Sequence, residues 1–419
     1  MTMGPRKGLR ILFLTPQIPF PPQQGTTIRN FNLLAQLSEH HIVDLLSFDE
    51  SPRETKDLGP LTEMCGEVRL VPAARRSMRE RAWSLLSTSL PDMALRLRSS
   101  LFEVSLRKMV ESQGYDVVQI EGIEMGPHLL CLRQWIQSRP GAMRSPWLVF
   151  EDHNAEYVLQ RRAYETDRRH LRRWIGAIYS WIQWRRLRKY EAAVCRSADA
   201  VVAVSEADAT ALESLVPGLC PAVVPNGVDL QLYDPLGVAP LPLGSNVLLF
   251  TGKMDFRPNV DGVLWFCDEV WPLVRERIPD AQFFIVGKDP HPRLRRLHGR
   301  PGITVTGWVG QILPYFAAAS VYVVPLRVGG GTRLKVLEAM AMGLPMVSTA
   351  LGAEGLGVES GEQLILADDP DQFAAAVLAL LEDESVSRRL GDNAQRFVRQ
   401  RYGWPAIVPR LEQVYASLD

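Results

Sequence analysis

Several common features are missing from this 419-residue sequence. Its five cysteines lie far apart and form no CxxC pair, so we expect no disulfide scaffold or zinc site and a reducing, cytoplasmic setting. The 47 basic and 47 acidic residues cancel, which disfavours a general nucleic-acid-binding protein. No apolar run approaches the roughly 18 residues of a membrane-spanning helix, and the first run, RILFLT, is too short for a signal peptide. We expect a soluble chain of two domains.

Short continuous apolar runs alternate with helical segments through most of the chain, a pattern typical of parallel sheets covered on both faces. The runs are RILFLT, HIVDLLSF, DVVQIEG, WLVFEDH, DAVVAVS and PAVVPNG, then NVLLFTG, AQFFIVG, GITVTGW, ASVYVVPL and MVST. The proline-rich residues 235–243 separate the two series and are typical of a linker. The pattern predicts an α/β protein with two doubly wound, Rossmann-like domains, 1–238 and 239–398, facing a cleft, and a terminal helix in 399–419.

Neither domain opens with the GxGxxG turn of dinucleotide-binding proteins, which disfavours a dehydrogenase. One alternative phosphate site is the loop PFPPQQGTTIRNF, where Gly25 and Thr26 precede a helix expected over 28–37. Free backbone N–H groups at that helix start would bind an anion. The same residues also suit a proline-stiffened turn in which Thr26 or Thr27 caps the helix, and the sequence leaves both readings open.

The second candidate loop is VGGGTRLKVLE, which leads into another helix. Gly330 and Gly331 allow close approach of the backbone to a ligand, and Thr332 can cap the helix. Arg333 and Lys335 then stand at the positive end of the helix dipole, where cations are normally disfavoured. If a diphosphate is bound there, both side chains would hold it by charge-assisted hydrogen bonds.

Glu338 lies on the same helix, six residues after Thr332, or roughly 9 Å along its axis. If a diphosphate binds at the start of the helix, the Glu338 carboxylate would lie near the nucleoside ribose. A carboxylate can accept hydrogen bonds from the two ribose hydroxyls. Leu334, Leu337 and Ala341 share roughly the same face. The alternative is a structural glutamate that caps a neighbouring loop.

Four segments together resemble one family. GGGTRLKVLEAMAMGLPMVS, VPNGVD, TGKMDFRPNVDGVLWF and VTGWV are similar to motifs of the retaining glycosyltransferases of family four, also called group 1. The resemblance implies the GT-B fold, in which the C-terminal domain binds a sugar nucleotide, the N-terminal domain binds the acceptor, and the last helix crosses back to the N-terminal domain. It also implies transfer with retention of the anomeric configuration, without a protein nucleophile.

The chain departs from the family pattern in the loops that bind the donor. Members usually have two glutamates seven residues apart; Glu338 matches the second, whereas Gly330 stands at the first. Lys253 takes the place of the usual arginine in GKMDFRPN, and Pro258 falls where a lysine is expected. The two cations of the second loop are the expected substitutes for the missing charge. The absent glutamate leaves the identity of the transferred sugar open.

His153 follows a buried run in VFEDHNAEY and is similar in position to the active-site histidine of the family, which lies near the transferred sugar. The alternative is a structural histidine that bonds a neighbouring loop.

We expect no metal or other cofactor. The close pair Asp369 and Asp371 is explained by an N-cap followed by Pro370 at the first helical position.

The stretch Arg161–Lys189 has a different character, with ten basic residues interleaved with three tryptophans. Such a segment suits peripheral contact with an anionic membrane surface, or the phosphates of a lipid-linked acceptor. A long surface helix whose aromatics pack on their own domain would show the same composition. Nucleic acid is the least expected partner, because the chain is neutral.

The sequence therefore predicts a glycosyltransferase that moves a sugar from a nucleotide-sugar donor to a glycan or lipid-linked acceptor, in bacterial surface-polysaccharide biosynthesis. The expected location is the cytoplasm, with peripheral contact at the inner face of the membrane. Two alternatives remain open at this point: a sugar-nucleotide epimerase of the same fold, and a catalytically silent protein that binds nucleotide sugars.

Overall fold

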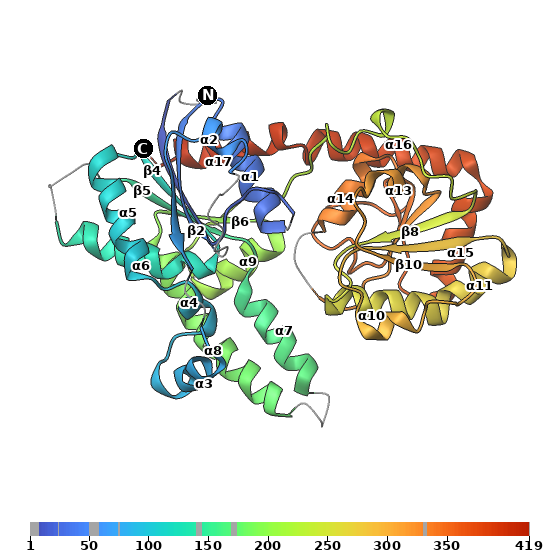
Figure 1. The fold of residues 1–419 in the computed structure, drawn as a ribbon, viewed down its shortest axis with the longest axis horizontal. Helices are drawn as coiled ribbons and strands as arrows, with labels where there is room; N and C mark the ends of the chain where they lie inside the picture. Colours follow the sequence, from blue (N-terminus) through green and yellow to red (C-terminus); the bar gives the residue numbers. More distant parts are fainter. Residues whose placement is uncertain are drawn as a thin grey trace. The chain divides into compact units, whose positions relative to one another are not determined.

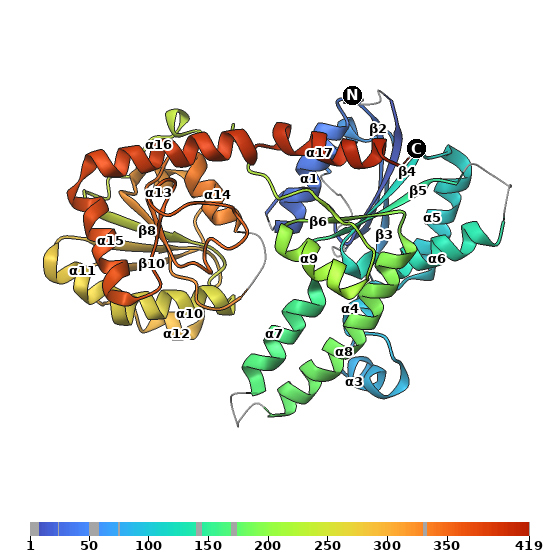
Figure 2. The same ribbon diagram turned by 180° about the vertical axis from the view of Figure 1, so that it is seen from behind.

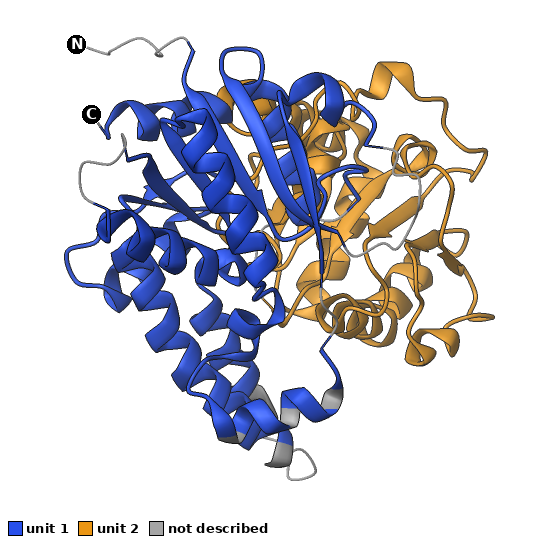
Figure 3. Cartoon of the chain, turned by 60° about the vertical axis from the view of Figure 1, so that its left-hand side comes forward, with its two compact units in different colours: residues 1–225, 407–419 blue, residues 226–406 orange. Residues whose placement is uncertain are grey.

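The computed structural model of the protein describes residues 8–23, 25–49, 58–73, 76–139, 145–168, 174–329 and 333–418. The chain divides into two compact units (Figure 3). Unit 1 comprises residues 1–225 and 407–419, and unit 2 comprises residues 226–406. Each unit is built around one parallel sheet with its own buried apolar core.

The sheet of unit 1 has seven strands in the order β3-β2-β1-β4-β5-β6-β7. They are β1 (Arg10–Thr15), β2 (Ile42–Asp49), β3 (Val68–Pro72), β4 (Val117–Glu121), β5 (Trp147–Asp152), β6 (Ala200–Ala203) and β7 (Ala222–Val223). β1 pairs in parallel with both β2 and β4, so the order of strands reverses there. Ligands of doubly wound sheets bind at this switch point, beyond the carboxyl ends of the strands.

The helices of unit 1 cover this sheet, and two of them also extend well beyond it. They are α1 (Gly25–Leu37), α2 (Leu61–Met64), α3 (Met78–Ser87), α4 (Asp92–Arg96), α5 (Ser100–Gln113), α6 (Gly126–Gln137), α7 (Glu156–Arg168), α8 (Trp174–Ser197), α9 (Glu206–Leu215) and most of α17 (Trp404–Ala416). Figures 1 and 2 show α7 and α8 side by side, running away from the sheet with α3 beside α8.

Unit 2 repeats the same topology with six parallel strands in the order β10-β9-β8-β11-β12-β13. The strands are β8 (Val247–Thr251), β9 (Gln282–Val286), β10 (Ile303–Gly307), β11 (Val321–Val324), β12 (Met346–Ser348) and β13 (Ile365–Leu366). The helices are α10 (Arg257–Trp265), α11 (Trp271–Arg277), α12 (Pro292–Arg295), α13 (Leu313–Ala318), α14 (Leu334–Ala341), α15 (Pro370–Glu382) and α16 (Glu384–Arg401). α10 and α11 lie on one face of the sheet, and α13 and α14 on the other (Figure 1). The switch point lies between β8 and β11.

The predicted α/β fold class is confirmed, and every predicted apolar run contains a strand. Between α10 and α11 the helical backbone contains a π-helical turn, Phe266–Val270. Pro272 explains this turn because it has no N–H to donate and its ring crowds the preceding turn. The expected cap at Asp369 is also present, since its side chain accepts hydrogen bonds from the N–H groups of Asp371 and Gln372 at 3.0 and 3.3 Å.

The two units divide earlier in the chain than the predicted boundary at residue 238. Val228 is buried in the core of unit 2 and its N–H donates to Tyr402 O at 2.8 Å. The proline-rich residues 235–243 are not a linker, because Leu241 N–H donates to Pro314 O and Gln282 donates to Leu243 O within the same unit. Residues 226–238 therefore belong to unit 2 and not to the N-terminal domain.

The end of the chain returns to unit 1, and the terminal helix expected within 399–419 is α17. α16 ends at Arg401, and α17 begins at Trp404. The hydroxyl of Tyr415 donates to Gln119 of β4 at 3.1 Å, which anchors α17 on the sheet of unit 1. Within the described residues, none of the helices has the length and apolar character needed to cross a membrane.

Candidate active site

The predicted donor-binding residues of unit 2 come from the loops after β8 and β11, the two strands at its switch point. Lys253 follows β8, whereas Arg333, Lys335 and Glu338 open α14 after β11. Residues 330–332, with the predicted Gly330, Gly331 and Thr332, lie outside the described residues. The loop positions match the edge of a doubly wound sheet where ligands bind.

Lys335 links these two loops. Its ammonium donates to Asn259 Oδ1 of α10 at 2.7 Å and lies 4.3 Å from the centre of the Phe250 ring. A Cβ atom at Gly252 would come within 2.8 Å of Lys335 Nζ. Gly252 also has a positive φ of 150°, a conformation that other residues rarely adopt. Because Gly252 has no side chain, the ammonium of Lys335 can lie against the backbone that follows β8.

The charge of Lys335 is poorly compensated in this position. The pKa of Lys335 is lowered to about 7, chiefly by burial; the charge of Glu338 opposes this shift, and the neighbouring cation of Arg333 adds to it. A lysine with a pKa near neutrality is partly uncharged until an anion approaches. Such perturbed groups are typical of functional sites.

Glu338 is held by a tyrosine that the predicted boundary assigned to the other domain. The Tyr233 phenol lies beside the carboxylate of Glu338 and favours its ionised form. Burial raises the pKa of Glu338, whereas Tyr233 and Lys335 favour its ionised form. Because a carboxylate has about four acceptor sites, Glu338 retains capacity for a second donor such as a ligand hydroxyl.

The other two predicted cations differ in burial. Arg333 occupies the N-cap position of α14 and is buried, with Nη2 3.7 Å from Glu354 Oε2. Lys253 is 54% exposed and pairs with Asp255 at 3.2 Å. The buried positive charge of this edge therefore comes from α14. The neighbouring Pro258 packs on the second loop, because a Cβ atom at Gly329 would lie 2.8 Å from its ring.

In unit 1, His153 directly follows β5 and lies against two buried carboxylates. His153 Nε2 is 2.9 Å from Glu121 Oε2 and 3.8 Å from Glu151 Oε1. Burial lowers the pKa of His153, but the hydrogen bond to Glu121 and the charges of both glutamates outweigh it, so the pKa is raised overall. The histidine is therefore stabilised as an imidazolium at the carboxyl edge of the sheet.

Arg29 of α1 supplies a second positive charge to this cluster. Its Nε forms an ion pair with Glu151, and its two terminal nitrogens donate to Val224 O and Pro225 O at 2.9 and 2.8 Å. Gln119 donates to Glu121 Oε1 and Glu151 Oε2 at 3.0 and 3.1 Å. The two buried carboxylates are thus balanced by Arg29 and His153.

The predicted anion loop of unit 1 is tied to the same cluster. α1 begins at Gly25, and Thr27 Oγ1 accepts a hydrogen bond from Gln23 N–H at 3.1 Å, so the hydroxyl that bonds the preceding loop belongs to Thr27. With its amide nitrogen turned towards the acceptors, Asn30 donates to Thr26 O at 3.3 Å and to Glu121 Oε2 at 2.9 Å. The structure therefore brings Thr26 and His153 to one edge.

Two family descriptions match the chain, "Glycosyltransferase Family 4" over residues 24–232 and "Glycosyl transferases group 1" over residues 245–383. Together they cover most of both units. The chain belongs to the group 1 glycosyltransferases. Its two parallel sheets have the GT-B fold that the sequence motifs implied.

Two relatives show how far the similarity extends. The glycosyltransferase is 23% identical over 406 residues to an "uncharacterized 44.6 kDa protein in cps region" of Klebsiella pneumoniae, covering 94% of this chain and 96% of that one. It is 29% identical over 207 residues to the phosphatidyl-myo-inositol mannosyltransferase of Mycobacterium tuberculosis, covering 46% and 53%. The match thus spans about half of that mannosyltransferase.

Solved structures share the fold along the whole chain. Sucrose-phosphate synthase from Thermosynechococcus elongatus has a TM-score of 0.69 at 21% identity, with 99% of each chain covered. The HepE protein of Anabaena, in complex with UDP and glucose, has a TM-score of 0.63 at 17% identity, covering 98% of the glycosyltransferase and 100% of HepE.

One group of described residues has the composition of a metal site. Possible ligand atoms of Glu121, Glu151 and His153 lie within 4.8 Å of one another. In the glycosyltransferase, however, donors already face these oxygens: Gln119 bonds both carboxylates, and Arg29 pairs with Glu151. A divalent cation on these three residues would stand against the guanidinium of Arg29 and would compete with the hydrogen bonds from Gln119, so the cluster does not fit a metal.

Sequence reasoning did not identify seven residues of these clusters: Arg29, Asn30, Gln119, Glu121, Glu151, Tyr233 and Asn259. The glutamates carried a signal, since each is an acidic residue at the end of a buried apolar strand, QIEG or VFED. A fully buried charge is rarely found without a partner. Tyr233 and Asn259 carried no comparable signal.

The stretch Arg161–Lys189 is divided among several roles in the glycosyltransferase. Arg161 pairs with Glu165 at 2.8 Å, and Arg186 donates to Leu85 O of α3 at 2.7 Å. The Trp184 ring stacks on Tyr164 of α7 at 6.2 Å between centroids. Arg169, Arg172 and Arg173 lie outside the described residues. Part of the stretch therefore packs within unit 1, and part remains exposed.

Proposed function

We propose that this glycosyltransferase transfers a sugar, with retention, from a nucleotide-sugar donor to a glycan or lipid-linked acceptor in bacterial surface-polysaccharide biosynthesis. The observation that carries the proposal is the pair Lys335 and Glu338 at the switch point of unit 2. A partly buried lysine with a lowered pKa beside a tyrosine-held carboxylate suits a ligand that joins a diphosphate to a ribose. The relative named as a phosphatidyl-myo-inositol mannosyltransferase supports this acceptor class, as does the structural neighbour WaaG, described as a glycosyltransferase involved in lipopolysaccharide biosynthesis.

Each residue has a defined part in the proposed reaction. Arg333 and Lys335 bind the diphosphate and stabilise the negative charge that it gains as the leaving group. Glu338 accepts hydrogen bonds from the ribose. His153, stabilised as an imidazolium by Glu121, donates to the transferred sugar and helps to position it. No protein nucleophile or metal is part of this proposal, so a chelator should leave the rate unchanged.

Incubation of the purified protein with a panel of nucleotide sugars tests the assignment against its alternatives. A transferase releases nucleoside diphosphate when an acceptor is added, whereas an epimerase forms a new nucleotide sugar without any acceptor. A silent binding protein does neither, although it is stabilised by the ligand. Product analysis by chromatography and by anomeric NMR signals also decides whether the configuration is retained.

Replacing Glu338 with glutamine should weaken nucleotide binding through the ribose. Loss of hydrogen bonds to a charged acceptor costs about 1.5–3 kcal/mol, so the dissociation constant for a nucleoside diphosphate should rise at least about tenfold. Calorimetry with the ribose and the 2′,3′-dideoxyribose forms of the nucleotide measures the effect.

The ribose and dideoxyribose forms should differ in the parent and bind alike in Glu338→Gln. Tyr233→Phe is the matched control, because it keeps the carboxylate and removes only the phenol that holds it; it should reduce the difference without abolishing it. If the parent binds both sugars equally, Glu338 does not contact the ribose.

We also propose peripheral contact with an anionic membrane through the exposed part of Arg161–Lys189, at the inner face of the membrane. Ile178 and Trp181 of α8 are 50% and 40% exposed, and Trp83 of the adjacent α3 is 70% exposed. The guanidinium of Arg185 lies 5.1 Å from the Trp181 ring centre. Exposed apolar side chains next to cations favour such a surface.

A further inference from the structure

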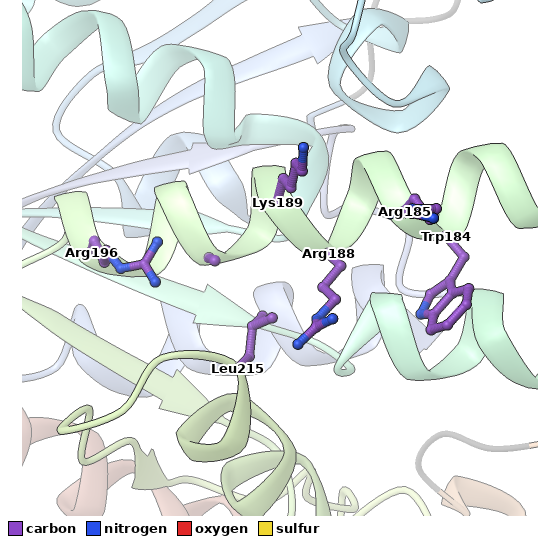
Figure 4. A pocket seen from close by; sticks show the side chains of 7 residues that line it. Trp184, Arg185, Arg188, Lys189, Arg196 and Leu215 are labelled. Atoms are coloured by element: carbon purple, nitrogen blue, oxygen red, sulfur yellow. The ribbon is translucent and has the colours of Figure 1, made fainter.

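A basic pocket lies on the C-terminal half of α8 in unit 1, and none of the cluster residues described above lines it. It has a volume of about 430 Å³ and is lined by one face of α8 and by Leu215 at the end of α9 (Figure 4). Its basic side chains are those of Arg185, Arg188, Lys189 and Arg196. Arg188 and Lys189 lie three and four residues after Arg185, and Arg196 lies eight and seven residues after them. This spacing places all four on one side of the helix.

These four cations are not neutralised by the protein. Across the parts of the chain that the structure describes, no carboxylate lies within 4.0 Å of any of them. Four like charges along roughly 16 Å of helix repel one another. A pocket of this kind is stabilised by an anion.

Trp184, which lines the pocket, carries a hydrogen-bond donor that the described residues do not use. The Trp184 ring is fixed by stacking on Tyr164 at an interplanar angle of 11°, yet in the described chain its Nε1 is buried without a hydrogen-bond partner. An indole N–H can only donate, and leaving a buried donor unpaired costs free energy. Figure 4 shows this nitrogen on the side of the ring that faces Arg188.

Guanidinium groups, an ammonium and an N–H donor together suit a ligand with several negatively charged oxygens, and phosphate is the common group of that kind. We propose that this pocket binds the phosphate of a membrane lipid headgroup. The same face of α8 continues outward to Ile178 and Trp181, which are exposed. Trp181 lies seven residues, or roughly 10 Å, before Arg188, so apolar side chains that enter the bilayer interface would place the cations beside headgroup phosphates.

The proposal deepens the proposed membrane contact by giving it a specific site, and it does not depend on sugar transfer. Nucleotide binding to unit 2 is therefore measured for every variant, since it should be unchanged whatever the outcome at the membrane.

The first experiment compares the parent with Arg188→Gln/Arg196→Gln on vesicles of phosphatidylcholine with 30% phosphatidylglycerol. A basic residue near an anionic surface contributes about 1 kcal/mol, which corresponds to about fivefold in partitioning. The double variant should therefore bind these vesicles about 25-fold more weakly, and neither protein should bind phosphatidylcholine alone. The control is Arg98→Gln/Lys108→Gln, which removes two exposed cations elsewhere in unit 1 and should stay within twofold of the parent.

The second experiment separates a lipid headgroup from free phosphate. Trp184→Phe keeps the stacked ring and removes the N–H, so it should weaken binding of soluble dihexanoyl-phosphatidylglycerol several-fold while preserving the thermal midpoint. Inorganic phosphate should bind the parent at least tenfold more weakly than this lipid. Equal affinity for inorganic phosphate, an equal loss in the Arg98/Lys108 control, or a parent that ignores anionic vesicles would each overturn the proposal.

Discussion

Arg29→Met should strongly destabilise unit 1. It removes the cation that pairs with the fully buried Glu151 and two donors to the carbonyls of Val224 and Pro225. Breaking one side of a buried ion pair costs about 3–5 kcal/mol. Urea unfolding followed by circular dichroism should therefore show an earlier transition for unit 1, while nucleotide should still protect unit 2.

The loss should also depend on pH. Burial raises the pKa of Glu151, and Arg29 opposes that shift, so removal of Arg29 raises the folded-state pKa further. A carboxyl group whose pKa is raised on folding stabilises the fold when protonated, and this stability is lost as the pH rises above the unfolded value. The variant should therefore be closer to the parent at pH 5 than at pH 8.

Arg29→Met/Glu151→Met is the control for this interpretation. Replacing both charges with apolar groups of similar size is often neutral, so the double variant should recover much of the stability and lose the added pH dependence. A single variant that unfolds with the parent, or a double variant that is worse than the single one, would contradict a structural role for the pair.

The fold could be predicted because each buried strand is recognisable from a short stretch of sequence. Parallel strands buried on both faces are continuous apolar runs, and RILFLT and NVLLFTG show this pattern. β3 was not predicted because VRLVP contains Arg69 and ends at a proline, which interrupts the apolar signal. The domain boundary was misplaced because proline-rich composition is typical of linkers, whereas residues 235–243 are fixed by hydrogen bonds distant in sequence.

The candidate site was most directly predictable where one element carries several of its residues. Helical spacing places Arg333, Lys335 and Glu338 together on α14, and the sequence indicates this directly. Tyr233 and Asn259 reach these side chains from 105 and 76 residues away, and no local pattern encodes such a contact. Whether the predicted residues bind a donor remains a prediction, which the following experiment tests.

Lys335→Met should weaken binding of a nucleotide sugar by at least about tenfold at pH 6 and should remove its pH dependence. The pKa of Lys335 is lowered to about 7, first by burial and then by Arg333, so the unliganded lysine is charged below pH 7 and loses its proton above it. A bound diphosphate favours the ammonium form and raises this pKa. Affinity in the parent should therefore be constant below pH 7 and should fall above it by up to about tenfold per pH unit.

Calorimetry with an intact nucleotide sugar measures this profile without interference, because its diphosphate has no terminal phosphate that titrates near neutrality. Methionine keeps an unbranched side chain against Phe250 and removes a partly buried charge, so the variant should be at least as stable as the parent. Lys253→Met is the matched control: that lysine is exposed and paired with Asp255, and its removal should leave the slope above pH 7 intact. If Lys335→Met retains the slope, the lysine does not bind the diphosphate, and the buried cation of α14 must be explained by packing alone.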